Sequence, residues 1–224
     1  MTAILELKHA TKVYDQGSVK VIAVNGVSLT LESSQVALIM GPSGSGKTTL
    51  LSMMGCILRP TSGEVLVDGE IVSGLKEGQL PNLRKSHFGF VFQSFNLFSS
   101  LTAAENVEVA LRLRHWNRQL LKTEAHRLLA EVGLESRSRF YPKDLSGGEK
   151  QRVSFARALA GNPRIILADE PTANLDSTTG REVLALLKSA AERDGKAVCV
   201  VSHDPKAETV AHKVLVLEDG KVKS

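Results

Sequence analysis

VALIMGPSGSGKTT, residues 36–49, is the stretch of sequence that decides the fold. Its five apolar residues, 36–40, predict a strand that is buried on both faces. The next eight, 41–48, match the pattern of glycine, any four residues, glycine, lysine, and serine or threonine. That pattern binds phosphate when it lies between a strand and a helix, and apolar residues at helical spacing do follow, from Leu50 to Leu58. We therefore predict a strand, a phosphate-binding loop and a helix, which begin an α/β fold.

The predicted loop has the chemistry to hold a nucleoside triphosphate. Its glycines permit a turn whose backbone amides converge on phosphate oxygens, and the following helix adds its N-terminal dipole. Lys47 is expected to neutralise the β and γ phosphates, and the hydroxyl of Thr48 to bind Mg²⁺. The residues predicted to bind the nucleotide here are Gly41, Ser43, Gly44, Ser45, Gly46, Lys47, Thr48 and Thr49.

Three further apolar runs also end directly in polar side chains. They are residues 89–92 followed by Gln93, residues 165–168 followed by Asp169 and Glu170, and residues 198–201 followed by Ser202 and His203. Short apolar runs of this kind are typical of strands in a parallel sheet. Since open parallel sheets bind ligands at the carboxyl ends of their strands, we predict that these side chains share one site with the phosphate-binding loop.

The carboxylates Asp169 and Glu170 are the predicted catalytic centre. Two adjacent acids at the end of a buried strand cost desolvation energy unless a cation or a reaction requires them. Asp169 is expected to hold Mg²⁺, and Glu170 to act as the general base that activates a water molecule. His203 lies at the same predicted edge, where it is expected to polarise the γ phosphate.

The remaining sequence predicts two flanking lobes around this sheet. Residues 4–7 and 27–31 alternate between apolar and polar, which predicts a small antiparallel β subdomain, and residues 214–217 predict a strand that enters a hairpin. The strand signal vanishes over residues 99–160, and 106–132 is predicted as helix. We expect one domain over 1–224, with a core and β subdomain at about 1–98 and 161–224 and an inserted helical subdomain at about 99–160.

Composition limits the class of protein and its compartment. The 28 basic and 24 acidic residues leave a mild excess of positive charge, so direct binding to nucleic acid is not expected. Cys56 and Cys199 lie in apolar runs and are predicted to be reduced core residues of a cytosolic protein. No apolar run reaches 18 residues and the N-terminus does not resemble a signal peptide, so membrane contact is expected to come through a partner.

Several basic residues of the predicted helical subdomain form a basic surface, for which two interpretations stay open. It is either a solvated face or a contact with lipid headgroups or a partner protein. Its members are Arg112, Arg114, Arg118, Lys122 and Arg127.

Leu145-Ser146-Gly147-Gly148-Glu149-Lys150-Gln151-Arg152 resembles the signature motif of the ATPase subunits of ABC transporters. The resemblance covers essentially the whole chain and implies a P-loop NTPase fold with a RecA-like, mostly parallel sheet. It also implies that ATP is the nucleotide, and that Ser146, Gly147 and Gly148 complete the ATP site of a second copy, so that ATP binding produces a homodimer. By the same resemblance, Tyr14 is expected to stack on adenine, with ordinary core packing as the alternative, and Asp176 is expected to contact the site across the dimer.

The same resemblance implies that Gln93 is a ligand of Mg²⁺, together with Thr48 and Asp169, and a catalytic residue. It also predicts a partner groove next to Gln93. In that family a helix of the membrane subunit docks beyond the glutamine, where Phe95 and Phe98 lie. We expect Phe95 and Phe98 to line that groove, with local core filling as the alternative. Phe90 and Phe92, on one face of a predicted strand, are expected to lie in the core.

Three further segments resemble one branch of the ABC ATPases more than the others. Residues 45–51, 90–97 and 168–176 look like the ATPases that power lipoprotein release, macrolide export and bacterial cell division, and 53–58 is similar to the ATPase of cyanobacterial heterocyst glycolipid export. This likeness implies export of a lipid, a lipoprotein or a hydrophobic compound, or mechanotransmission. It also implies membrane permease subunits, a periplasmic adaptor, and a place on the cytoplasmic side of the inner membrane. The alternative is a nucleic-acid- or ribosome-associated ABC ATPase.

Overall fold

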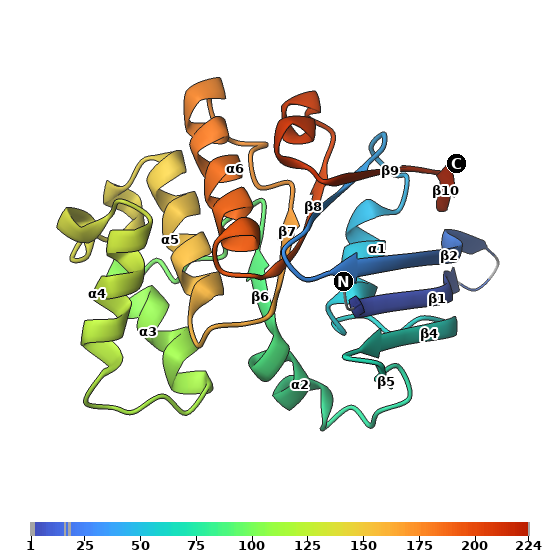
Figure 1. The fold of residues 1–224 in the computed structure, drawn as a ribbon, viewed down its shortest axis with the longest axis horizontal. Helices are drawn as coiled ribbons and strands as arrows, with labels where there is room; N and C mark the ends of the chain where they lie inside the picture. Colours follow the sequence, from blue (N-terminus) through green and yellow to red (C-terminus); the bar gives the residue numbers. More distant parts are fainter. Residues whose placement is uncertain (1–2, 16, 18, 224) are drawn as a thin grey trace.

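The computed structural model describes residues 3–15, 17 and 19–223, whose strands form two sheets (Figure 1). The larger sheet has six strands in the order β10-β9-β3-β8-β7-β6, and the smaller has four in the order β2-β1-β4-β5. The six strands of the larger sheet are β3 (Val36–Met40), β6 (Phe88–Val91), β7 (Ile165–Asp169), β8 (Ala197–Ser202), β9 (Lys213–Glu218) and β10 (Lys221–Lys223). The four of the smaller sheet are β1 (Ala3–Asp15), β2 (Lys20–Glu32), β4 (Ser62–Val67) and β5 (Glu70–Ile71).

The six-stranded sheet is mostly parallel, as predicted. Strand β3 lies between β8 and β9 and is parallel to both, and β7 lies between β6 and β8 and is parallel to both. Only β10 is antiparallel to its neighbour, β9, with which it forms the predicted hairpin. The carboxyl ends of β3, β6, β7 and β8 therefore lie at one edge, which brings the predicted polar residues together.

Alternate residues of the central strands face two different hydrophobic cores. Val36 and Leu38 of β3 belong to the core that the helices cover, whereas Ala37 and Ile39 belong to the core shared with the four-stranded sheet. A strand that is buried on both faces needs apolar residues at every position, which explains the continuous apolar runs. The four-stranded sheet is antiparallel throughout, as its alternating sequence predicts.

Helices lie on both faces of the larger sheet. Figure 1 shows α3, α4 and α5 at one end of the molecule and the four-stranded sheet at the other. The α-helices are α1 (Lys47–Met54), α2 (Leu80–His87), α3 (Ala103–Leu113), α4 (Leu121–Glu131), α5 (Gly147–Leu159) and α6 (Ser177–Glu192). Short 3-10 helices cover η1 (Glu135–Arg137), η2 (Pro142–Asp144) and η3 (Pro205–Val210). The limits proposed for the helical subdomain, about 99–160, remain a prediction.

The expected helix over residues 106–132 is wrong in one respect, because two helices occupy this stretch. Helix α3 starts at a capping box, in which the Thr102 side chain accepts from the amide of Glu105 and the Glu105 carboxylate accepts from Thr102. It ends at Leu113, and His115 then takes a left-handed φ of 56°, which an α-helix cannot contain. Helix α1 is also shorter than expected, since it ends at Met54 and leaves Ile57 exposed.

The expectation that Phe90 and Phe92 lie in the core is correct only in part. Phe90 packs against the core shared with the four-stranded sheet, whereas Phe92 belongs to neither core. Phe88 is the fully buried aromatic of β6, whereas Phe90 and Phe92 are half-buried and their rings stack on each other. Strand β6 is at the edge of its sheet and ends at Val91, so Phe92 lies beyond the end of the strand. Both rings line a groove that is described below.

Both cysteines are buried and free, as predicted. Burial raises the pKa of the Cys56 thiol to about 11 and that of the Cys199 thiol to about 12. Among the helices of the described residues, none combines the length and the apolar character needed to span a bilayer.

Candidate nucleotide-binding site

A cavity of about 590 Å³ opens at the carboxyl edge of the parallel sheet, where the phosphate-binding motif lies. Its walls come from the loop between β3 and α1 and from the ends of β6, β7 and β8. The residues that line it are Ala23, Pro42, Ser43, Gly44, Gly46, Lys47, Thr48, Thr49, Gln93, Glu170 and His203. The structure therefore brings the predicted loop, glutamine, glutamate and histidine to one site.

The loop that precedes the N-terminus of α1 has the polar groups needed to bind an anion. Lys47 is 7% exposed, and its ammonium donates to the carbonyl oxygens of Gly41 at 2.8 Å and Pro42 at 2.9 Å. The hydroxyl of Ser45 is buried and has no hydrogen-bond partner among the described residues. A buried cation together with an unpaired hydroxyl at a helix N-terminus is the arrangement that suits phosphate oxygens.

Gly46 is one of the positions in this loop where only glycine fits. Its φ is 100°, and a Cβ added there would collide with the carbonyl oxygen of Ala23. Ala23 also lines the cavity, although it was not among the residues predicted from the sequence. No local signal marks Ala23, because its place depends on how β2 packs against the loop.

Asp169 lies at the end of β7 and shares a hydrogen bond with the loop. The hydroxyl of Thr48 donates to Asp169 Oδ1 at 3.1 Å. Burial raises the pKa of the Asp169 carboxyl above its ordinary value, and the neighbouring charge of Glu170 adds to the rise, while the Thr48 hydrogen bond opposes it. A carboxylate in this setting gains from a nearby cation. Thr48 and Asp169 are therefore the residues that could hold a metal ion through oxygen.

Glu170 and His203 form a close pair at the back of the cavity. The Nδ1 atom of His203 lies 2.9 Å from Glu170 Oε2 and 3.0 Å from Oε1, and the amide of His203 donates to Oε2 at 3.4 Å. The side chain of Glu170 is 12% exposed and that of His203 is 65% exposed. Glu170 also has a left-handed φ of 45°, a strained conformation of the kind that is found at functional sites. The histidine thus orients a mostly buried carboxylate toward the cavity.

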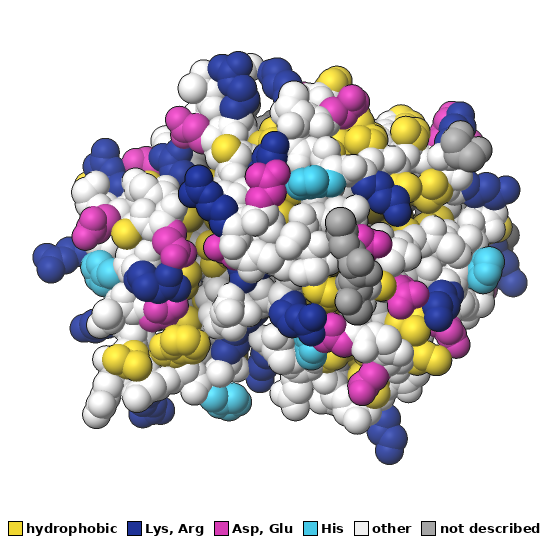
Figure 2. Space-filling model, in the orientation of Figure 1, with side chains coloured by type: hydrophobic (Ala, Val, Ile, Leu, Met, Phe, Trp, Pro, Cys, Tyr) yellow, Lys and Arg dark blue, Asp and Glu magenta, His cyan; other side chains and the backbone are white. Residues whose placement is uncertain are grey.

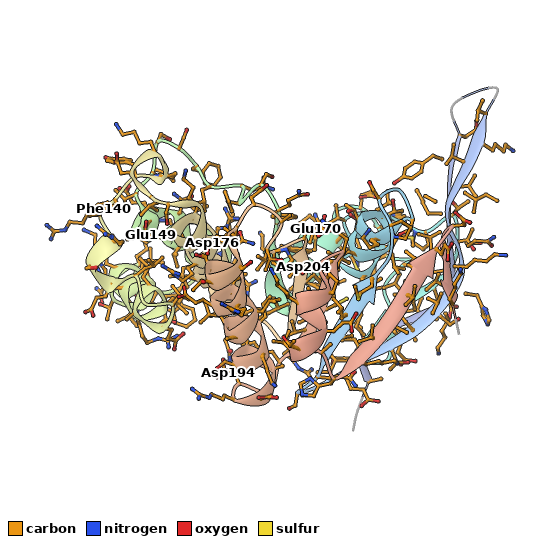
Figure 3. All side chains as sticks on the ribbon, turned by 90° about the horizontal axis from the view of Figure 1, so that it is seen from above. Phe140, Glu149, Glu170, Asp176, Asp194 and Asp204 are labelled. Atoms are coloured by element: carbon orange, nitrogen blue, oxygen red, sulfur yellow. The ribbon has the colours of Figure 1, made fainter. Side chains whose placement is uncertain are left out.

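Four predicted residues lie away from this cavity. Ser146 caps the N-terminus of α5, where its side chain accepts from the amide of Glu149, and Asp176 caps α6 by accepting from the amides of Thr178 and Thr179. Gly147 and Gly148 form the first turn of α5, and none of the four lines the cavity. Figure 3 shows Glu149 and Asp176 close to the helices on one side of Glu170. The N-terminal end of α5 therefore does not line the cavity of its own chain.

Tyr14 does not line the cavity either. It lies near the end of β1, is 38% exposed, and the Lys12 ammonium lies 5.5 Å from the centre of its ring. Its expected stacking on adenine stays a prediction.

Three supporting contacts were not predicted from the sequence. Gln151 of α5 is fully buried and donates to the carbonyl of Pro171 at 2.8 Å, next to Glu170. Asn174 donates to the carbonyl of Gln93 at 3.0 Å. Arg157 of α5 donates to the carbonyls of residues 95 and 96, in the loop after Gln93. These bonds join α5 to both the Glu170 turn and the Gln93 loop, and nothing local in the sequence marks such long-range partners.

A match to a family model decides which family this arrangement represents. The model described as ABC transporter matches residues 24–173, which is more than half of the chain and includes the phosphate loop, Asp169 and Glu170. The chain belongs to the ABC transporter family.

Related proteins agree with this assignment and identify the chain as an ABC ATP-binding cassette. It is 43% identical over 222 residues to the "Macrolide export ATP-binding/permease protein MacB" of Salmonella choleraesuis and, equally, of Escherichia coli K12. The match covers 99% of this chain but only 34% of those relatives, so the chain spans about a third of their length.

Solved structures of cassettes superpose closely on this one. A dimeric structure of the cassette MJ0796 bound to ADP and Pi has a TM-score of 0.92 and 42% identity, over 98% of this chain and 97% of that one. The cassette cbiO1 from Clostridium perfringens, part of the transporter complex cbiONQ, has a TM-score of 0.89 and 27% identity, over 100% of this chain and 88% of that one. The P-loop NTPase fold, the ATPase family and the ATP ligand predicted from the sequence are thereby confirmed. None of these relatives supports the nucleic-acid alternative.

Proposed function

We propose that this cassette is the ATP-hydrolysing motor subunit of an ABC export or mechanotransmission complex. The single observation that carries the proposal is a divided site: the phosphate loop and the Glu170–His203 pair share one cavity, while the Ser146 end of α5 lies elsewhere. In the proposal two copies associate around ATP, so that Ser146 of each copy meets the ATP held by Lys47 of the other. The similar cassette MJ0796 is a dimer in its structure bound to ADP and Pi, which supports a dimer here.

Residues of both copies have distinct roles in the proposed hydrolysis. Lys47 and the loop amides hold the β and γ phosphates, and Glu170, kept in place by His203, accepts a proton from the attacking water. Gln93 orients that water, and Asp176 contacts the site from the opposite copy. Mg²⁺ fits Thr48 and Asp169, because it prefers oxygen ligands and commonly takes few carboxylates beside phosphates. It would supply charge neutralisation on the phosphates.

A groove next to Gln93 is the proposed docking place for a membrane permease. Apolar side chains dominate its floor, and the loop of residues 93–98, here called the groove loop, forms one rim. Phe98 lines the groove and is 52% exposed, while Phe95 is half-buried and does not line it. Arg157 of α5 donates hydrogen bonds to the groove loop, and Ser146 caps the N-terminus of the same helix. A displacement of the groove loop would therefore be transmitted to α5 and to Ser146. This connection couples a docked helix to the ATP site.

The export assignment rests on likeness to the macrolide export proteins. The chain spans about a third of those relatives. In the proposal it works with membrane permease subunits, and co-purification from membranes would detect them. We place the cassette on the cytoplasmic side of the inner membrane through those subunits, with a periplasmic adaptor in the same complex. The substrate class, a lipid, a lipoprotein or a hydrophobic compound, follows from the same likeness.

The substitution Glu170→Gln tests the proposed hydrolysis. A general base contributes about 10²–10⁴-fold to a rate, so steady-state ATP turnover should fall by that factor while ATP binding is kept. Light scattering after size exclusion should then show an ATP-dependent dimer of the variant. Glu70→Gln is the matched control, since Glu70 is exposed on β5 and outside the cavity. Undiminished turnover by the Glu170→Gln protein would refute the proposed base.

A further inference from the structure

The end of α3, the start of α4 and the connection between them contain a number of unbalanced basic residues equal to the charge excess of the chain. Residues 109–123 contain four basic side chains and no acidic one. The chain has 28 basic and 24 acidic residues, so the rest of it has 24 of each and is formally neutral. The basic side chains of this stretch, here called the basic turn, are Arg112, Arg114, Arg118 and Lys122.

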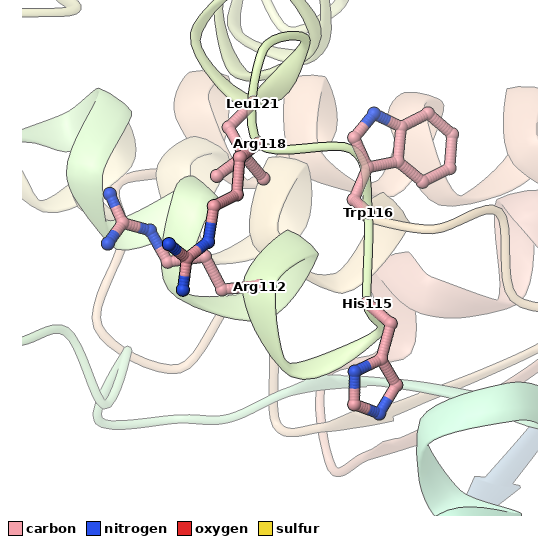
Figure 4. Close-up of a pocket in the computed structure, with 5 residues that line it drawn as sticks. All are labelled: Arg112, His115, Trp116, Arg118 and Leu121. Atoms are coloured by element: carbon pink, nitrogen blue, oxygen red, sulfur yellow. The ribbon is translucent and has the colours of Figure 1, made fainter.

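The basic turn surrounds a cavity of about 630 Å³ that has no carboxylate in its lining. The cavity is lined by Arg112, His115, Trp116, Arg118 and Leu121 (Figure 4). Figure 4 shows the two guanidinium groups on one side of the connecting segment and the indole ring on the other. Arg112 pairs with Glu108 at 3.1 Å yet its side chain stays 66% exposed, and Arg118 is exposed. Two guanidinium groups at one cavity favour an anion between them.

Apolar side chains accompany these charges on the surface. Leu113 is 55% exposed and Leu120 is 50% exposed, at the two ends of the connection. Trp116 is half-buried, and its Nε1 atom is shielded without a hydrogen-bond partner among the described residues. Figure 2 shows hydrophobic side chains with Lys or Arg around them at the end of the molecule where α3 and α4 lie. Basic, leucine and tryptophan side chains together are the composition that suits the headgroup region of a bilayer.

The basic turn also adjoins the permease groove. Leu113 and Arg114 line that groove, and Arg112, on the preceding position, lines the basic cavity. A surface next to the groove would face the membrane whenever a permease is docked. A merely solvated face would explain the charges, and the permease groove would explain the exposed Leu113, but neither explains the exposed Leu120 near the single tryptophan.

We propose that the basic turn binds anionic phospholipid headgroups directly. Arg112 and Arg118 contact the headgroup phosphates, and Leu113, Leu120 and the Trp116 ring lie at the boundary of the acyl region. The contact is independent of the permease, so it orients the cassette on the bilayer in addition to the docked helix. Anionic lipid, rather than an acidic protein segment, is the occupant because the exposed apolar side chains need an apolar phase beside the charges.

Fluorescence of the unaltered full chain tests this directly, because Trp116 is the only tryptophan. Vesicles of phosphatidylcholine with phosphatidylglycerol should shift the emission to the blue and co-sediment the protein, and phosphatidylcholine vesicles should do neither. Raising the salt concentration should reverse the binding, because exposed charges are screened. Arg112→Gln/Arg118→Gln should weaken the partition by about 25-fold, since each basic residue near an anionic surface contributes about fivefold.

The matched control is Lys8→Gln/Lys20→Gln, which removes the same charge from the four-stranded sheet at the other end of the molecule. It should keep most of the vesicle binding, and ATP binding by both variants should show that they are folded. The proposal is overturned if neither vesicle binds, if the control loses as much as the arginine variant, or if soluble glycerol phosphate or polyglutamate gives the same shift. Since no permease is present, these outcomes leave the export proposal unaffected.

Discussion

Replacing Gly148 by alanine should destabilise the cassette through a contact inside one chain. A Cβ added at Gly148 would lie less than 3.0 Å from Thr179 Cγ2, which is closer than real Cβ atoms approach a neighbour. Thr179 cannot rotate away cheaply, because its hydroxyl donates to Asp176 Oδ2 at 2.6 Å and its branched side chain is stiff. Overpacking of this kind costs about 1–3 kcal/mol, whereas alanine gains at most about 1 kcal/mol over glycine in a helix.

Because the added Cβ would lie far inside the 3.0 Å limit, the upper part of that cost, about 2–3 kcal/mol, applies. Subtracting about 1 kcal/mol for the helix preference of alanine leaves a loss of about 1–2 kcal/mol, which lowers the Tm of a chain this long by about 2–8 °C. Thermal unfolding of the nucleotide-free protein measures the shift. Thr179→Ser removes Cγ2 but keeps the hydroxyl, and the remaining distance to Thr179 Cβ, 3.4 Å, is ordinary contact. In that background Gly148→Ala should become neutral or stabilising. An unchanged Tm for the single variant, or the same loss in both backgrounds, would refute the reasoning.

Three further predictions concern α5 and the core. The Ser146 amide holds the pKa of the Glu149 carboxyl below its ordinary value, so Glu149→Gln should lower the Tm at pH 7. The difference should vanish as the pH falls through that lowered pKa, and a difference that persists once Glu149 is protonated would contradict this. Cys56 and Cys199, with their raised pKa values, should not react with a thiol reagent at pH 8 until the protein unfolds, and rapid labelling of the native protein would be the opposing result. Arg157→Met should speed amide hydrogen exchange in the groove loop by about tenfold or more, because the substitution removes charge-assisted hydrogen bonds of about 1.5–3 kcal/mol. Helix α6 should keep its protection, and unchanged exchange in the groove loop would count against the proposed coupling between that loop and α5.

The phosphate loop and the parallel sheet could be predicted because their causes are local. Residues 36–49 contain the buried strand, the glycines and the lysine in one stretch. Glu170 and His203 are 33 residues apart, yet each ends a parallel strand, so topology alone brings them to one edge and into hydrogen-bond contact.

The features that could not be predicted depend on neighbours that are distant in sequence. Phe90 and Phe92 have the pattern of a core strand, but β6 lies at the sheet edge, and strand order is not a local property. Gly148 was expected to complete the ATP site of a second copy, and its contact with Thr179 was not predicted because that contact exists only once α5 lies against α6. The chain breaks between α3 and α4 where His115 takes a left-handed conformation. The break was not predicted, because apolar residues at helical spacing continue on both sides of it.

Thiol cross-linking of the ATP-loaded protein is the most direct test of the divided site. The variant Ser43→Cys/Ser146→Cys in the Glu170→Gln background places one thiol on the phosphate loop and one on α5, and the native cysteines are buried. With a short bifunctional thiol reagent, we predict a covalent dimer in the presence of ATP and little of it without ATP. Absence of that dimer in a protein that demonstrably binds ATP, or equal amounts with and without ATP, would contradict the claim that two copies share each nucleotide.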